Sequence, residues 1–270
     1  MKILTLNTWQ ERGPWRERWD LIFRGLKEYA PDIAGFQEVF NMEWAELIRE
    51  RSGYPWLCVS GEHSGLIFLS KYPPVGQECL IMKTRSPLEE YRRYAFGAMF
   101  ETPRGKVPCF NTHLSWQVSD EPARVGQVKE LDEWVREKAG LSPAVVMGDF
   151  NTAPGTAPIH FLTSRGWSDT FEQANPWVRD FELSGGARQS PDGFSNSQRK
   201  GKAYLTWDYK NPYAEKERDK MAERRIDYIF VTRRDGPFSR IRSSRVVFDS
   251  PEGEVWPSDH FGVLTEFSNG

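Results

Sequence analysis

The short apolar run at residues 145–147, with the glycine that follows it, constrains the fold of this chain more than any other feature. A run rich in β-branched residues predicts a buried strand, and Gly148 lets the backbone turn where that strand ends. Asp149 and Asn151 then lie at the mouth of the strand and point the same way, because alternate residues of an extended chain share a face. A carboxylate beside an amide can hold a metal ion, or a phosphate and the water that attacks it. Gly-Asp and Asn-Thr are also ordinary turn formers, so this segment alone leaves both interpretations open.

Strands and helices alternate along the chain, with hairpins between some of the strands. Helical spacing of apolar residues predicts a helix over residues 15–30 and another that opens at Asp120 or Glu121, and Asn41 is expected to cap a third. Further strands are predicted at residues 2–7, 33–39, 65–70, 78–82, 94–101, 107–112, 226–231, 245–248 and 261–267. This mixture favours an α/β (α+β) fold in one domain spanning residues 1–270, with two mixed sheets stacked face to face and helices outside.

A long irregular segment interrupts this pattern at residues 181–223. It is rich in Gly, Ser, Lys, Arg and Pro. We interpret it as a surface excursion, since loops of this length are usually functional or disordered.

Composition limits the partners and the compartment. A net charge of −2 and a pI of about 6.2 give no global positive field, which disfavours nucleic acid as a partner but leaves a nuclease with a locally basic cleft open. The 3 cysteines share no metal-like spacing and indicate a reducing compartment. The sequence enters a predicted strand at Lys2, and no apolar run approaches the length of a membrane span. We therefore expect a cytoplasmic, monomeric protein without a leader or a transmembrane segment.

Polar residues gather at the predicted strand ends. They are Asn7, Glu38, His113, Asp149, Asn151, Asp227, Asp259 and His260. Oxygen-rich carboxylate and amide groups suit a hard cation such as Mg²⁺ or Mn²⁺, and Mg²⁺ needs only one or two protein carboxylates beside substrate phosphate and water. Each residue also has a structural interpretation when taken alone: Glu38 as a helix-initiating carboxylate, Asn7 as a turn residue, either histidine as a core residue.

Hydrolysis of a phosphate ester would give the histidines distinct tasks. His260 is the natural general base, because the unperturbed pKa of histidine lies near neutral pH. Asp227, bonded to the other ring nitrogen, would fix the tautomer and favour the imidazolium that forms. His113 would donate to a phosphoryl oxygen or protect the leaving group.

Aromatic and cationic residues beside these motifs are candidates for substrate binding. Trp116 and Trp207 can line a cleft, because aromatic rings offer contact area at little entropic cost. Arg93 is either a phosphate-binding guanidinium or, with Arg92, part of a solvated charge pair. Arg225 faces the same choice between a phosphate contact and an ion pair on an edge strand.

The order of the motifs is similar to that of a known superfamily. The motifs are Leu6-Asn7-Thr8, Gln37-Glu38, Thr112-His113-Leu114, Gly148-Asp149-Phe150-Asn151, Arg225-Ile226-Asp227-Tyr228 and Ser258-Asp259-His260. Together they resemble the endonuclease/exonuclease/phosphatase superfamily, of the deoxyribonuclease I-like fold, over nearly the whole chain. Its members include apurinic-site endonucleases, inositol polyphosphate 5-phosphatases, mRNA deadenylases and neutral sphingomyelinases.

The resemblance implies a fold and a metal site. The fold is a four-layer α/β sandwich, in which two mixed sheets pack together and helices cover both outer faces. Asn7 and Glu38 would belong to the principal metal site, with Asp259 at or near the metal, and some members hold a second ion.

The resemblance also implies catalytic roles. Asp149 and Asn151 would bind phosphate and orient the nucleophile, and Asp227 and His260 would form the base dyad. His113 stands where apurinic-site endonucleases carry a tyrosine, which argues against that branch.

The C-terminal third resembles neutral sphingomyelinases and their bacterial relatives. The matching motifs are Thr206-Trp207-Asp208, Asn211-Pro212 and Trp256-Pro257-Ser258-Asp259-His260-Phe261-Gly262-Val263. We count Trp207 and Asn211 among the candidate substrate-binding residues. The hydrophobic hairpin of the membrane-acting sphingomyelinases is absent from the sequence, and some bacterial relatives are phosphatases of soluble sugar phosphates.

We therefore expect a hydrolase that depends on one or two Mg²⁺ or Mn²⁺ ions and cleaves a phosphate ester by in-line attack of an activated water. The substrate would be a small or amphiphilic phosphomonoester or phosphodiester, such as a sugar phosphate or a sphingomyelin-like lipid. A DNA or RNA nuclease of the same superfamily is the alternative. A binding module with a relic site is disfavoured, because every motif position carries a chemically competent residue.

Overall fold

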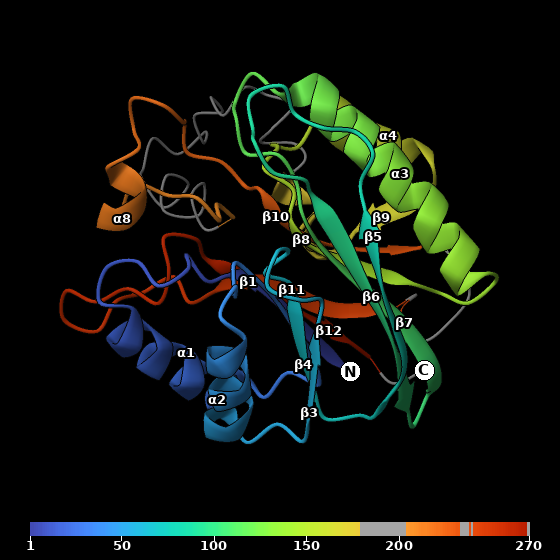
Figure 1. Cartoon of the computed structure of the whole chain (residues 1–270), viewed down its shortest axis with the longest axis horizontal. Helices are drawn as coiled ribbons and strands as arrows, with labels where there is room; N and C mark the ends of the chain where they lie inside the picture. The colour runs from blue at the N-terminus through green and yellow to red at the C-terminus, as the bar shows by residue number, and fades with distance from the viewer. Residues whose placement is uncertain (179–203, 233–237, 239, 269–270) are drawn as a thin grey trace.

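Two six-stranded mixed sheets pack against each other, and helices cover both outer faces (Figure 1). The computed structural model describes residues 1–178, 204–232, 238 and 240–268. The four-layer α/β sandwich expected from the sequence is confirmed.

The first sheet carries the N-terminal strand at its centre. Its order is β11 (Ile241–Val247), β12 (Gly262–Phe267), β1 (Lys2–Asn7), β2 (Ile33–Gln37), β4 (Ile67–Ser70) and β3 (Trp56–Val59). Only β1 and β2 are parallel neighbours, and Asn7 pairs with Gln37 at their ends. The register therefore sets Asn7 beside Glu38 at the carboxyl edge of this sheet.

The second sheet repeats this arrangement with one parallel pair. Its order is β5 (Pro74–Ile81), β6 (Tyr94–Thr102), β7 (Gly105–His113), β8 (Val145–Asp149), β10 (Asp227–Thr232) and β9 (Trp167–Asp169). In the parallel pair β7–β8, His113 lies opposite Asp149. Strand β10 runs antiparallel to β8 and begins with Asp227, also opposite Asp149. Three of the predicted site residues thus share one edge.

The helices divide between the two outer faces (Figure 1). Helices α1 (Trp15–Tyr29) and α2 (Met42–Ser52) cover the first sheet, and α3 (Glu121–Ala139) and α4 (Ala157–Ser164) cover the second. The shorter helices are α5 (Thr170–Ala174) and α8 (Pro212–Glu215). The predicted cap of α2 is confirmed, since the Asn41 side chain accepts a hydrogen bond from the backbone N–H of Trp44.

Apolar side chains fill the three spaces between the four layers. Phe68 and Met147 lie between the sheets, Trp19 of α1 packs on α2 and the first sheet, and Leu131 of α3 packs on the second sheet. None of the helices within the described ranges combines the length and hydropathy that a bilayer crossing requires.

The predicted surface excursion at 181–223 is packed where the structure describes it. Residues 181–203 lie outside the described residues. Residues 204–223 contain α8 and a small apolar cluster in which Trp207, Ala214 and Met221 pack on Ile226. This part of the segment is thus built into the body of the protein beside β10.

Position 148 requires glycine. Its φ is +142°, and the carbonyl oxygen of Thr112 lies where a side chain would begin. A Cβ there would lie 2.0 Å from Thr112 O. We expect Gly148→Ala to lower the free energy of unfolding by about 3 kcal/mol or more, from the clash and the strained backbone together. Chemical denaturation measures this loss of stability. Gly76→Ala is the matched control, since nothing lies within 4 Å of a Cβ there, and it should change stability by less than about 1 kcal/mol. Equal stabilities of the two variants would contradict this account of Gly148.

Candidate active site

The predicted strand-end residues converge on one cavity of about 660 Å³. Those that line it are Asn7, Glu38, His113, Asp149, Asn151, Asp259 and His260. Asp227 is fully buried and lies behind His260. Residues from both sheets, up to 253 positions apart in the sequence, therefore face a common space.

The Asp149 carboxylate is the centre of this arrangement. Its Oδ2 accepts a hydrogen bond from Asn7 Nδ2 at 3.0 Å and lies 3.4 Å from His113 Nε2. Its Oδ1 accepts the backbone N–H of Asn151 at 2.9 Å. The Asn7 amide also donates to Glu38 Oε1 at 3.3 Å. One carboxylate at the end of β8 thus ties together residues from β1 and β7 and the loop after β8.

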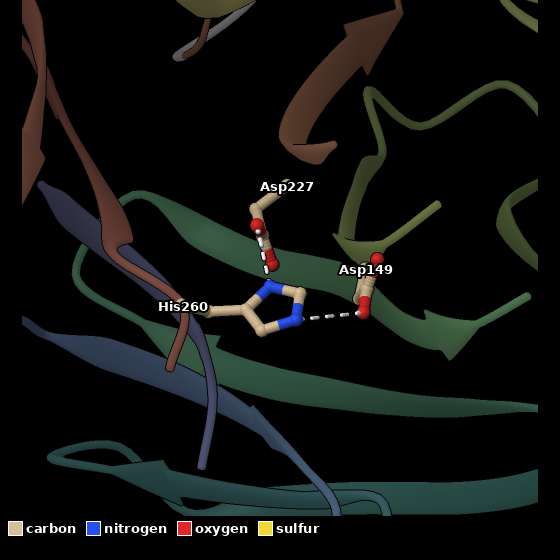
Figure 2. A group of neighbouring side chains, drawn as sticks. All are labelled: Asp149, Asp227 and His260. Carbon is tan, nitrogen blue, oxygen red and sulfur yellow. Dashed lines mark hydrogen bonds and ion pairs between the residues drawn. The ribbon is translucent and has the colours of Figure 1, made fainter. Parts of the chain in front are cut away.

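His260 lies between two carboxylates (Figure 2). Its Nδ1–H donates to Asp227 Oδ2 at 3.0 Å, and its Nε2 faces Asp149 Oδ2 at 3.7 Å. Burial alone would lower the pKa of His260, but Asp227 and Asp149 outweigh it and raise the pKa to about 10. The Asp227 contact fixes which ring nitrogen points toward the cavity.

Asp149, Asp227 and His260 lie close enough together to hold a cation. Their ligand atoms all lie within 4.8 Å of one another. The 3.0 Å separation of His260 Nδ1 and Asp227 Oδ2 is nevertheless that of a hydrogen bond, which occupies both atoms with a shared proton. A cation is therefore better placed among the other carboxylates that border the cavity.

Glu38 is partly buried and borders the cavity together with the buried carboxylates Asp149 and Asp259. Burial raises the pKa of Glu38 and of Asp149, and it raises the pKa of Asp259 to about 7, with repulsion from Glu38 adding to the effect. Clustered carboxylate oxygens are the donors that Mg²⁺ and Mn²⁺ prefer, and a divalent cation would relieve their repulsion. The donor set fits such an ion.

His113 is neutral in this setting. Burial lowers its pKa well below the usual value, and Arg93 and His260 lower it further. A neutral imidazole can still donate one N–H, so His113 suits hydrogen bonding to an oxygen rather than charge neutralisation.

The loops that carry the site hold several non-glycine residues in the left-handed region. These are Trp9, Gln10, Glu38 and Asn151, with φ between 49° and 66°. Such conformations persist only where neighbouring groups impose them.

Arg18 of α1 is one of those groups. Its buried guanidinium donates to five backbone carbonyls, those of Thr8, Trp9, Gln10, Arg12 and Pro257. It therefore joins the loop after Asn7 to the loop that leads to Asp259. Our sequence interpretation missed Arg18. Its position could have indicated this role. Arg18 lies between Trp15 and Ile22 on the core-facing stripe of the helix, and a buried guanidinium there needs many hydrogen-bond acceptors.

A buried amide pair under the cavity was also missed. Gln37 Nε2 donates to Asn111 Oδ1 at 2.6 Å, and Asn111 Nδ2 donates to Phe36 O at 2.8 Å. The pair joins β2 of the first sheet to β7 of the second, one residue before Glu38 and two before His113. Because buried amides must be paired, it fixes how the two sheet edges meet.

The predicted substrate-binding residues divide into two groups. Arg93, Trp116 and Trp207 line the cavity, but Asn211 and Arg225 are buried outside its lining. Arg225 forms a buried ion pair at 2.6 Å with Asp169, the last residue of the edge strand β9.

Of the two interpretations of Arg93 open at the sequence level, the structure contradicts the solvated charge pair. Its Nε and one terminal nitrogen grip the Glu89 carboxylate at 2.8 and 2.9 Å, and its side chain is 7% exposed. It is therefore a buried ion pair, not a solvated charge pair with Arg92. Glu89 also accepts the Trp116 backbone N–H, so the pair positions Trp116 at the cavity.

Comparisons with known proteins agree with this fold. The model of the endonuclease/exonuclease/phosphatase family matches residues 4–260. Among solved structures, an endonuclease/exonuclease/phosphatase from Bacteroides vulgatus is 20% identical with a TM-score of 0.72, covering 99% of this chain and 98% of its own. Truncated TDP2 from Caenorhabditis elegans is 18% identical, with a TM-score of 0.72 and coverage of 99% and 97%. A mannosyl-6-phosphatase from Bacteroides thetaiotaomicron is 19% identical, with a TM-score of 0.72 over 100% of both chains. A comparison with curated protein sequences found no match.

The Asp227–His260 contact generates a direct prediction. In metal-free protein, Asp227→Asn removes a negative charge bonded to the imidazole, so the pKa of His260 should fall by about one to three pH units. Titration of the His260 ring followed by NMR measures it. Asp32→Asn is the control, since Asp32 bonds to Lys2 and Lys71 instead, and it should leave the titration unchanged. A His260 titration that is the same in Asp227→Asn and in the wild type would contradict the assigned pairing.

Proposed function

The chain belongs to the endonuclease/exonuclease/phosphatase family, and we propose that it is a divalent-metal-dependent phosphoesterase that acts on a small or amphiphilic phosphate ester. Members of this family are hydrolases of phosphate esters, which confirms the expected enzyme class. The metal requirement, the residue roles and the substrate are our proposals.

The observation that carries the proposal is that one cavity brings a cluster of carboxylates next to a histidine–carboxylate pair. Glu38, Asp149 and Asp259 border the cavity, and His260, bonded to Asp227, faces Asp149 across 3.7 Å. Phosphoester hydrolysis needs cationic charge at the phosphoryl oxygens and a proton acceptor at the attacking water. This cavity offers a place for each, close together.

We assign the cation to Glu38 and Asp259, with Asp149 and Asn7 beside it. When bound, Mg²⁺ or Mn²⁺ would supply positive charge that neutralises the carboxylates, polarises the ester and lowers the pKa of His260. Without that charge Asp227 and Asp149 favour the protonated form of His260, which is not a base. The proposed base therefore depends on the proposed cation.

The remaining residues take roles that follow from their contacts. Neutral His260 accepts the proton of the attacking water at Nε2, and Asp227 stabilises the imidazolium that results. His113 donates an N–H to a phosphoryl oxygen. Asn151 is held by Asp149 and by the Leu114 carbonyl, which its side chain contacts at 3.0 Å, and it borders the space where the phosphate would lie.

The substrate proposal rests on the walls of the cavity. Trp116, Tyr91 and Phe40 line it and are 38–52% exposed, so they present free aromatic surface beside the catalytic residues. Arg12 and Arg92 also line it. A sugar or an amphiphilic group can pack on such rings while the cations hold its polar part. The fold similarity to a mannosyl-6-phosphatase supports a sugar phosphate as the first substrate to test.

The metal assignment predicts a specific defect. Glu38→Gln should raise the Mn²⁺ concentration needed for half-maximal activity by about tenfold or more, because it removes a charged ligand. Glu43→Gln, an exposed change on α2, is the control and should behave as the wild type. Chelation should abolish wild-type activity, and added Mg²⁺ or Mn²⁺ should restore it. Hydrolysis that survives metal stripping would contradict the proposal.

The base assignment predicts a second defect. His260→Ala should lower kcat by about two to four orders of magnitude, the range for a general base. His160→Ala, an exposed histidine on α4, should leave kcat unchanged. Steady-state hydrolysis of sugar phosphates, a generic monoester, a generic diester, sphingomyelin and DNA measures the effect. If His260→Ala keeps near wild-type kcat on every substrate cleaved, His260 is not the base.

A further inference from the structure

Thr206 lies at the junction between the two catalytic residues Asp227 and His260. Its hydroxyl accepts the backbone N–H groups of Ile226 at 3.0 Å and Asp227 at 3.1 Å. Its carbonyl accepts the backbone N–H of Phe261 at 2.8 Å. One buried residue thus binds the start of β10 and the residue directly after His260.

Trp207 extends this junction to the imidazole ring itself. Its backbone pairs with Arg224, with N–H to O distances of 2.9 and 3.0 Å in the two directions. Its indole ring meets His260 edge to face, with ring centroids 4.9 Å apart and an interplanar angle of 72°. This contact limits rotation of the imidazole about its side-chain bonds.

Asn211 joins residues 206–211 to the loop that carries Asp259. Its side-chain amide donates to Ser258 O at 2.7 Å, and Ser258 Oγ donates to Asn7 O at 2.7 Å. Asn211 Oδ1 separately accepts the Tyr213 N–H as the cap of α8. The loop that carries Asp259 and His260 is therefore bound at Ser258 and again at Phe261.

The need for such a segment follows from the topology. Asp227 opens β10 in the second sheet, whereas His260 precedes β12 in the first. Backbone pairing within a sheet cannot set a distance between residues of two different sheets. Contacts between the sheets set the 3.0 Å bond between Asp227 and His260, and residues 206–211 contact the chain beside both of these residues.

We propose that residues 206–211 form a positioning clamp, in which Thr206 and Asn211 set the geometry of the Asp227–His260 pair for the proposed phosphoesterase reaction without themselves contacting the substrate. Thr206 and Asn211 are both fully buried and lie outside the cavity lining. The structure thus gives Asn211 a different task from the substrate binding predicted by the sequence. The clamp rests on the proposed function, because it acts through the proposed base.

Two substitutions each remove the side-chain contacts of one clamp residue. Thr206→Val keeps the shape but leaves two buried N–H groups without their acceptor. Asn211→Asp keeps the acceptor that caps α8 and replaces the donor to Ser258 O. Both should lower kcat by about 10- to 100-fold, the scale of a small misplacement of catalytic groups, with KM changed by less than about threefold. Thr206→Ser restores the hydroxyl and should recover wild-type kcat.

Two controls separate positioning from general destabilisation. Thr102→Val removes a comparable hydroxyl that bonds Gly105 O and the Arg104 N–H at the far end of β6, and it should leave kcat unchanged. In a His260→Ala background, Thr206→Val should lower kcat by less than about twofold, because a residue that acts through His260 has nothing left to position. An equal loss of kcat with and without His260 would overturn the clamp, as would wild-type kcat in folded Thr206→Val and Asn211→Asp.

If the wild type hydrolyses no phosphate ester, the proposed function is refuted but the clamp is not. An NMR measurement then tests the clamp without any activity. The His260 Nδ1 proton is identified by its loss in Asp227→Asn. Its exchange with water should quicken at least about tenfold in Thr206→Val and Asn211→Asp, and stay unchanged in Thr206→Ser and Thr102→Val. Unchanged exchange in both clamp variants would overturn the clamp.

Discussion

The buried carboxylate of Asp149 is the group on which the rest of this site depends. Asn7, His113, Asn151 and His260 all meet it, and they come from both sheets. Burial disfavours its charged form and raises its pKa. The hydrogen bonds from Asn7 and Asn151 offset part of that cost by stabilising the carboxylate. Asp149 borders the cavity together with Glu38 and Asp259 and faces His260, so it couples the proposed cation site to the proposed base.

The sequence predicted the layers and the strand-end residues because these depend on local pattern. Apolar periodicity marks β8, and a polar residue at its end must emerge at the sheet edge. The parallel pairs β1–β2 and β7–β8 then place such ends side by side. Strands β3 and β9 escaped prediction. The first is a partly exposed edge strand without alternation, and the second has three residues, too few for a period.

Partners and side-chain directions could not be predicted in the same way. Arg93, Asn211 and Arg225 were expected to meet substrate, yet each bonds a buried group of the protein, namely Glu89, the Ser258 carbonyl and Asp169. The position of Arg18 on the core-facing stripe of its helix indicates that it needs acceptors but not which loops supply them, and Thr206 gave no local sign of its partners. A polar residue near a motif can serve the substrate or the scaffold, and only its three-dimensional neighbours distinguish the two.

The most direct measurement of the central claim is a crystal structure of the protein with Mn²⁺, in which anomalous scattering locates the ion. The account predicts an anomalous peak in the cavity bound to the Glu38 carboxylate, with the His260–Asp227 hydrogen bond intact. A cavity without a peak at saturating Mn²⁺, or a peak that replaces the proton between His260 and Asp227 and leaves Glu38 unbound, would contradict it.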